Sequence, residues 1–105
     1  MIQHTMMVSF DQPLPATELD RYLSDIERVM LDSGFVQSFA ARRHIPMPGE
    51  ETIPALIASV IVLLGVADAD ALAQSFTAPG LHEVIGRWQS RYPYKVAFAN
   101  HAPLA

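Results

Sequence analysis

The stretch IPALIASVIVLLGV, from Ile53 to Val66, is almost entirely apolar. A strand with one buried face alternates apolar and polar residues, whereas this run carries apolar side chains at both parities. Both faces of the strand that it predicts must therefore be covered by protein. The rest of the chain offers only two helices, which can cover one face of a sheet, so the second face requires another protein chain.

The composition agrees with a buried interface. Of the 105 residues, 50% are hydrophobic and 17% are charged. A single small domain over residues 1–105 has a large surface for its volume, so this apolar excess indicates self-association. The net charge of −4 and the scattered Lys and Arg residues exclude the clustered basic surface that binds nucleic acid. The absence of cysteine excludes a disulfide framework, a thiolate nucleophile and a zinc–thiolate site.

The sequence carries no targeting, membrane or cofactor signature. The segment 1–10 lacks the basic flank of a secretory signal, and the apolar run is shorter than the roughly 20 residues that span a bilayer. We therefore expect a cytoplasmic protein with no membrane partner. No two of the four histidines share an element at metal-ligand spacing, and no glycine-rich phosphate loop is present, so we expect neither a metal nor a cofactor.

Hydrophobic periodicity predicts the order strand, helix, strand, strand, helix, strand. The expected elements are a strand Ile2–Phe10, a helix capped by Thr17 and ended by Gly34, a strand Phe35–Ile45, the apolar run as third strand, a helix beginning at Asp68 or Asp70 that is interrupted at Pro79-Gly80 and continues through Trp88, and a strand Tyr94–Asn100. Trp88 completes an apolar stripe at helical spacing, so we expect it to lie in the core.

This order predicts a ferredoxin-like α+β sandwich. Two right-handed crossovers give a four-stranded antiparallel sheet, ordered 4-1-3-2, with both helices on one face. The free face then carries half of the side chains of the third strand. We expect a homodimer in which the free sheet faces of two copies pack together. The sequence leaves open whether the parity of Val60 or that of Ile61 faces the second copy.

His4 is the leading candidate for a functional side chain. It shares the parity of Met6 and Val8, which should face the helices. The fourth strand runs antiparallel to the first, so Asn100 should lie beside His4. A buried polar group without a partner costs about 1–3 kcal/mol, and Asn100 can supply one. Two interpretations follow: a structural histidine with a satisfied hydrogen bond, or a histidine in a ligand pocket.

Three further residues are candidates for a functional role. Tyr22 lies on the inner stripe of the first helix, where its ring either fills the core or places a hydroxyl in a cavity. His82 is near the start of the resumed helix, where backbone N–H groups suit an anion, or it is simply exposed. Arg43 belongs to the only basic cluster, with Arg42 and His44. Charges on an edge strand commonly prevent unwanted pairing, and the alternative role is to bind a carboxylate.

Three features together resemble the stress-responsive A/B barrel (Dabb) family. They are the opening strand from His4 to Phe10, the interrupted helix around residues 78–82, and the apolar third strand. The resemblance follows the element order over the whole chain and implies a dimeric α+β barrel. The family contains proteins of unknown role and a plant polyketide cyclase.

The resemblance to that cyclase implies a pocket between sheet and helices. His4 matches its first-strand histidine, and Tyr22 lies near the aromatic residue of its first helix. Its second-helix histidine falls near Leu81, one place from His82, and its third-strand histidine has no counterpart in this chain.

We therefore predict a homodimeric α+β barrel that binds a small, mostly apolar molecule between sheet and helices. Acid–base chemistry of the cyclase or isomerase kind would use His4, Tyr22 and His82, with Asn100 and Arg43 contacting the ligand. One alternative is a non-enzymatic, stress-associated structural dimer. Another is a cofactor-independent monooxygenase, which related α+β barrels include. A cavity lined by His4 and Tyr22 would favour ligand binding, and a packed core would favour the structural dimer.

Overall fold

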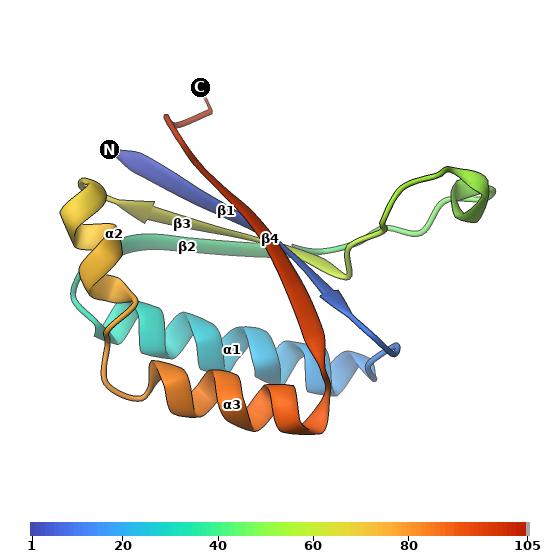
Figure 1. Cartoon of the computed structure of the whole chain (residues 1–105), viewed down its shortest axis with the longest axis horizontal. Helices are drawn as coiled ribbons and strands as arrows, with labels where there is room; N and C mark the ends of the chain where they lie inside the picture. The colour runs from blue at the N-terminus through green and yellow to red at the C-terminus, as the bar shows by residue number, and fades with distance from the viewer. Residues whose placement is uncertain (105) are drawn as a thin grey trace.

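The computed structural model describes residues 1–104, and it forms one sheet with helices against one face (Figure 1). Its elements are β1 (Ile2–Phe10), α1 (Ala16–Asp32), β2 (Val36–Arg43), the 3₁₀ turn η1 (Glu50–Thr52), β3 (Val60–Val66), α2 (Ala69–Ser75), α3 (Leu81–Arg91) and β4 (Tyr94–His101). The strands are antiparallel in the order β2-β3-β1-β4, which is 4-1-3-2 counted from the other edge. The expected ferredoxin-like fold is confirmed.

The register of β3 settles which of its side chains face the helices. Val60, Val62, Leu64 and Val66 are each 1% exposed or less, and they form the floor of the core. Ile61 and Leu63 alternate with them and therefore point out of the opposite face. On the neighbouring strand Met7 pairs with Ile61 and lies on that same outer face, where half of its side chain is exposed. The outer face of β3 is therefore apolar, as the double-sided run predicted.

The first half of the apolar run is not a strand, which corrects the sequence prediction. Residues 44–59, which we call the arm, form a long loop that projects from the end of the sheet (Figure 1). Pro54 lacks the N–H that a ladder requires. The chain rejoins the sheet at Ser59, whose N–H donates to Val8 O at 2.8 Å and whose Oγ accepts from Phe10 N at 3.1 Å. β3 begins at the next residue.

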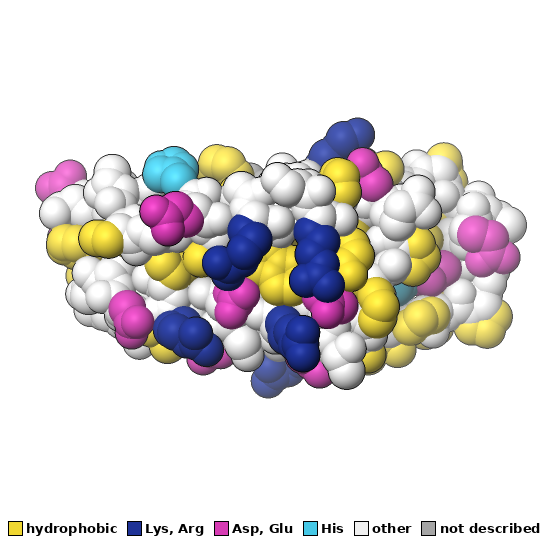
Figure 2. All heavy atoms as spheres, turned by 90° about the horizontal axis from the view of Figure 1, so that it is seen from below, with side chains coloured by type: hydrophobic (Ala, Val, Ile, Leu, Met, Phe, Trp, Pro, Cys, Tyr) yellow, Lys and Arg dark blue, Asp and Glu magenta, His cyan; other side chains and the backbone are white. Residues whose placement is uncertain are grey.

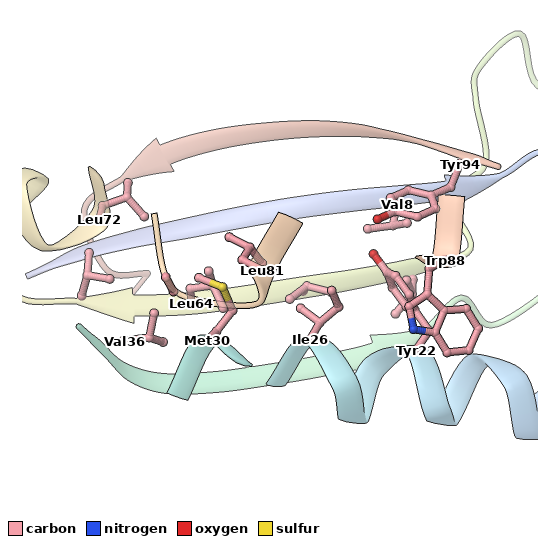
Figure 3. Close-up of a cluster of buried hydrophobic side chains, with 14 of the residues drawn as sticks. Val8, Tyr22, Ile26, Met30, Val36, Leu64, Leu72, Leu81, Trp88 and Tyr94 are labelled. Atoms are coloured by element: carbon pink, nitrogen blue, oxygen red, sulfur yellow. The ribbon is translucent and has the colours of Figure 1, made fainter. Parts of the chain in front are cut away.

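The core lies between the sheet and the helices (Figure 3). From α1 it takes the buried side chains Leu19, Tyr22, Ile26 and Met30. Trp88 of α3 is 5% exposed and donates its Nε1–H to Asp25 Oδ2 at 2.9 Å. This bond satisfies the one polar atom of the indole and links α3 to α1, which confirms that Trp88 is a core residue.

The helix ends follow local chemistry, with one correction. α1 begins before Thr17: Pro15 occupies the N-cap with φ −55° and its carbonyl accepts the first N–H groups, so no side chain caps the helix. Asp68 caps α2 as expected, accepting from Ala71 N at 2.8 Å. Gly80, with φ 85°, occupies the left-handed region that a residue with a side chain avoids, and it separates α2 from α3. No helix within residues 1–104 is long and apolar enough to cross a membrane.

Candidate functional site

His4 lies at the end of the sheet where β1 begins, and it is 2% exposed. Its register partner on β4 is Asn100, and the two side chains meet with Nδ1 2.6 Å from Asn100 Oδ1. The contact that parity predicted is therefore present. Because an amide oxygen can only accept, Nδ1 is the donor of this bond, and in the neutral tautomer that makes it the lone pair is on Nε2.

Two aromatic rings cover the imidazole. The centroid of Phe76, which follows α2, lies 5.4 Å from that of His4, and the centroid of Phe98 on β4 lies 4.9 Å away. Phe76 is 38% exposed and Phe98 is 63% exposed, although Phe98 is on the helix-facing parity. Tyr94 at the start of β4 is buried, whereas the inner-face residues Val96 and Phe98 further along the strand are exposed, so the inner face of β4 is open beyond Tyr94. His4 is thus separated from solvent by two side chains rather than by a helix.

A cavity of about 100 Å³ lies between the sheet and the helices. Its lining residues are Met6, Tyr22, Ile26, Met30, Leu64, Phe76, Leu81, Ile85, Tyr94 and Val96. No charged side chain lines it, and its only side-chain oxygens are those of Tyr22 and Tyr94. Figure 3 shows these two hydroxyls pointing at each other across the space below β1. His4 does not line the cavity, but Phe76 touches both.

The hydroxyl groups of Tyr22 and Tyr94 form a pair, and both are uncharged because both pKa values are raised. Their ring centroids are 5.3 Å apart. Burial raises the pKa of Tyr22 far above its usual 10.0, and the charge and hydrogen bond of Tyr94 raise it further. Burial also raises the pKa of Tyr94, against hydrogen bonds to Tyr22 and Gln89 that lower it. Because both phenols stay protonated, one hydroxyl can donate to the other, and the second then keeps an O–H that can donate into the cavity.

The other sequence-predicted residues do not join this group. His82 is exposed on α3 and does not line the cavity. Arg43 is exposed on β2, where its guanidinium pairs with Asp20 and approaches Ala16 O. Among residues 1–104, no three His, Asp or Glu side chains are grouped so that they could hold a metal ion.

Sequence reasoning missed Tyr94 and Phe76 as neighbours of the site. Tyr94 was placed at the start of the fourth strand, and its parity with Val96 and Asn100 would have pointed it toward the helices. Phe76 follows the end of α2, and nothing in a single sequence places it beside His4.

No protein-family model matches the chain, and no curated protein matches its sequence. Solved structures do match it over nearly its whole length. A Dabb family protein with a ferredoxin-like fold from Mesorhizobium loti has a TM-score of 0.74 at 18% identity, with 99% of this chain and 97% of that chain covered. A dimeric protein of unknown function with a ferredoxin-like fold from Bacteroides fragilis has a TM-score of 0.73 at 12% identity, with 97% and 95% covered.

A third neighbour is SnoaB, a cofactor-independent oxygenase from Streptomyces nogalater. Its TM-score is 0.74 at 8% identity, with 99% of this chain and 93% of that chain covered. The chain therefore shares the ferredoxin-like fold of a Dabb family protein, as the resemblance implied. At these identities the likeness establishes the fold and does not transfer an activity.

The raised pKa of Tyr22 predicts a loss of stability in alkali. The folded state holds this proton while the unfolded phenol releases it near its usual 10.0, so the stabilisation is complete below about pH 10 and is lost as pH rises further. We expect the free energy of unfolding of Tyr22→Phe to fall less steeply above pH 10 than that of the wild type, by about 1.4 kcal/mol per pH unit. Urea unfolding followed by circular dichroism measures both slopes, and equal slopes would contradict the burial of this hydroxyl.

Proposed function

We propose that this protein is a homodimer whose protomers each bind a small, neutral, mostly apolar molecule between sheet and helices. The observation that supports the ligand site is the cavity with its single pair of tyrosine hydroxyls. A cavity lined by apolar groups and a few convergent polar atoms is the usual form of a small-molecule site. The absence of a charged lining residue favours a neutral ligand, because a buried charge would lack a partner.

The size of the cavity sets the part of the ligand that is enclosed. An apolar cavity of about 150 Å³ in another protein accepts benzene, so about 100 Å³ holds a group no larger than a small ring. The remainder of a larger ligand would lie toward β4, where Val96 is 43% exposed and borders both the cavity and the open inner face. The free O–H of the tyrosine pair would orient an acceptor oxygen such as a ketone or ester carbonyl.

His4 is the group that we propose for acid–base chemistry on a bound molecule. Asn100 orients the ring and fixes the tautomer, which presents Nε2 as a base. Neither tyrosine can act as a base near neutral pH, because both pKa values are raised. Phe76 must turn aside for a ligand in the cavity to reach His4. The proposal leaves out His82 and Arg43, since neither lines the cavity.

A non-enzymatic structural dimer is the second candidate. The observations that favour it are the small enclosed volume and the position of Phe76 between the cavity and His4. In that case His4 and Asn100 form a satisfied polar pair within the fold, and the tyrosine pair fills the core.

The contrast between the two surfaces of the protein supports the homodimer. The helix side carries basic side chains interspersed with Asp and Glu (Figure 2), including the pairs Arg87–Asp25 and Arg91–Glu18. The outer sheet face presents Met7, Ala40, Ile61, Leu63, Ala97 and Ala99, and the same face also carries the polar residues Gln3, Thr5, Ser9, Ser38, Arg42, Lys95 and His101. A charged helix layer suits water, whereas a sheet face with a cluster of apolar side chains around β3 indicates a protein partner. The dimeric Bacteroides fragilis neighbour has the same fold.

Leu63→Lys should convert the dimer to a monomer. The lysine ammonium would lie at the centre of the sheet-to-sheet contact without a counter-ion, whereas in a monomer it reaches water. Ser90→Lys, on the exposed surface of α3, is the matched control and should remain dimeric. Light scattering coupled to gel filtration gives the mass, and circular dichroism verifies the fold. A dimeric, folded Leu63→Lys would show that this face is not the interface.

A neutral ketone should bind the cavity more tightly than a hydrocarbon or carboxylate of similar shape. We expect cyclobutanone to bind about threefold to tenfold more tightly than methylenecyclobutane, through one net hydrogen bond, and cyclobutanecarboxylate to bind least. Trp88, whose ring centroid is 5.7 Å from that of Tyr22, reports binding by fluorescence.

The double variant Tyr22→Phe/Tyr94→Phe tests the hydrogen bond separately from the apolar cavity, because a single variant would leave the other O–H free to donate. It should abolish the preference for the ketone and leave the hydrocarbon bound. If no probe binds the wild type, the ligand site itself is wrong and the structural dimer is favoured.

A further inference from the structure

The arm exposes an unusual amount of apolar surface. The exposed fractions are 77% for Ile45, 64% for Met47, 58% for Ile53, 96% for Leu56 and 42% for Ile57. Isolated exposed apolar residues are common in soluble proteins, but five large ones within thirteen residues form an extended patch that marks an interaction surface. Leu56 in particular gains nothing within its own protomer.

Hydrogen bonds within the arm hold its shape. His44 Nε2 lies 2.8 Å from Glu50 Oε1, and Thr52 Oγ1 donates to Gly49 O at 2.7 Å. Three prolines restrict the backbone, at positions 46, 48 and 54. A segment ordered before association loses less conformational entropy when it binds, so the arm is suited to a tight contact.

The base of the arm and the outer sheet face form one concave surface. Residues 56–58 border two hollows, of about 360 Å³ and about 440 Å³, and Met7 lines both. Ile61 completes the first hollow and Ala97 the second. Figure 1 shows the arm rising past the end of the sheet on the side away from the helices. A partner protein bound to the outer sheet face would therefore lie next to the arm.

The surface area matches one side of a dimer interface. The protomer exposes 6810 Å², whereas a monomer of this mass is expected to expose about 5,800 Å². The excess of about 1,000 Å² is close to the roughly 800 Å² that each partner buries in a typical stable complex. The radius of gyration, 14.3 Å, also exceeds the value of about 13 Å expected for this length.

We propose that the arm clasps the second protomer, so that the side chains of Ile45, Met47, Ile53 and Leu56 are buried between the two copies. This inference rests on the homodimer proposed above and adds a second contact region to it. A two-fold axis makes each arm contact twice per dimer. Glu50 and Glu51 are the only acidic or basic residues between positions 45 and 59, and their negative charge disfavours an anionic lipid surface as the occupant.

The test compares dimer dissociation constants measured by sedimentation on dilution. The two-fold symmetry means that each substitution removes two leucine contacts per dimer. We expect Leu56→Ser to raise the dissociation constant at least tenfold, since losing even one buried leucine has about that effect. Met47→Ser should act in the same direction. Leu31→Ser is the matched control: Leu31 is an exposed leucine at the end of α1, away from the outer sheet face, and its change should leave the constant unaltered.

A measurement on the unmodified sequence keeps the test independent of folding defects. Dimers mixed from methyl-labelled and unlabelled chains should give intermolecular nuclear Overhauser effects from the Ile45, Met47 and Ile53 methyls. Arm variants that leave the constant unchanged, or arm signals that are entirely intramolecular, would overturn the clasp. If the arm tests failed but Leu63→Lys still dissociated the dimer, the homodimer through the outer sheet face would be supported and only the contact made by the arm would be wrong. A wild type that is monomeric at every concentration would overturn both.

Discussion

The fold depends on one constraint, which is that β3 is apolar on both faces. Its inner face, from Val60 to Val66, is sealed by the helices with 1% exposure or less. Its outer face has no element of the same chain to cover it, because both crossovers place their helices on one side. Removing apolar surface from water is favourable by about 25 cal/mol per Å², so covering this face with a second chain would contribute substantially to the free energy of association. The self-association that we propose follows from the sequence of this strand.

The candidate site is a consequence of where the helices stop. They leave the inner face of β4 open beyond Tyr94, so Phe98 is 63% exposed although it points toward the helix layer. The cavity, the tyrosine pair and the His4–Asn100 contact all lie along this margin. The chemistry available there is that of neutral donors and one oriented imidazole, because no charged side chain lines the cavity.

Periodicity and topology rules predicted the features that depend on local pattern. The alternation in β1, together with the antiparallel pairing of β1 and β4, placed Asn100 beside His4, and the structure has that contact at 2.6 Å. The stripe ending in Trp88 was predicted as core, but the Asp25 carboxylate that accepts its N–H was not. The sequence could not predict which side chains of β3 face the helices, because both of its faces are apolar. The observed strand register was needed to decide this.

The failures have physical causes that a single sequence conceals. Residues 53–58 have the composition of a buried strand, yet they belong to the arm, because Ser59 fixes where the chain re-enters the sheet. Apolar residues buried in a core and apolar residues buried between subunits look alike in a sequence. The distance between Phe76 and His4 depends on how α2 ends, which no helical pattern encodes.

Sedimentation equilibrium of the unmodified chain at micromolar concentration tests the central claim most directly. Burial of the outer face of β3 against a second copy predicts a mass of twice 11.6 kDa, with dissociation only on strong dilution. A folded species of 11.6 kDa at all concentrations would mean that this apolar face is stable in water, and the proposed dimer would be wrong.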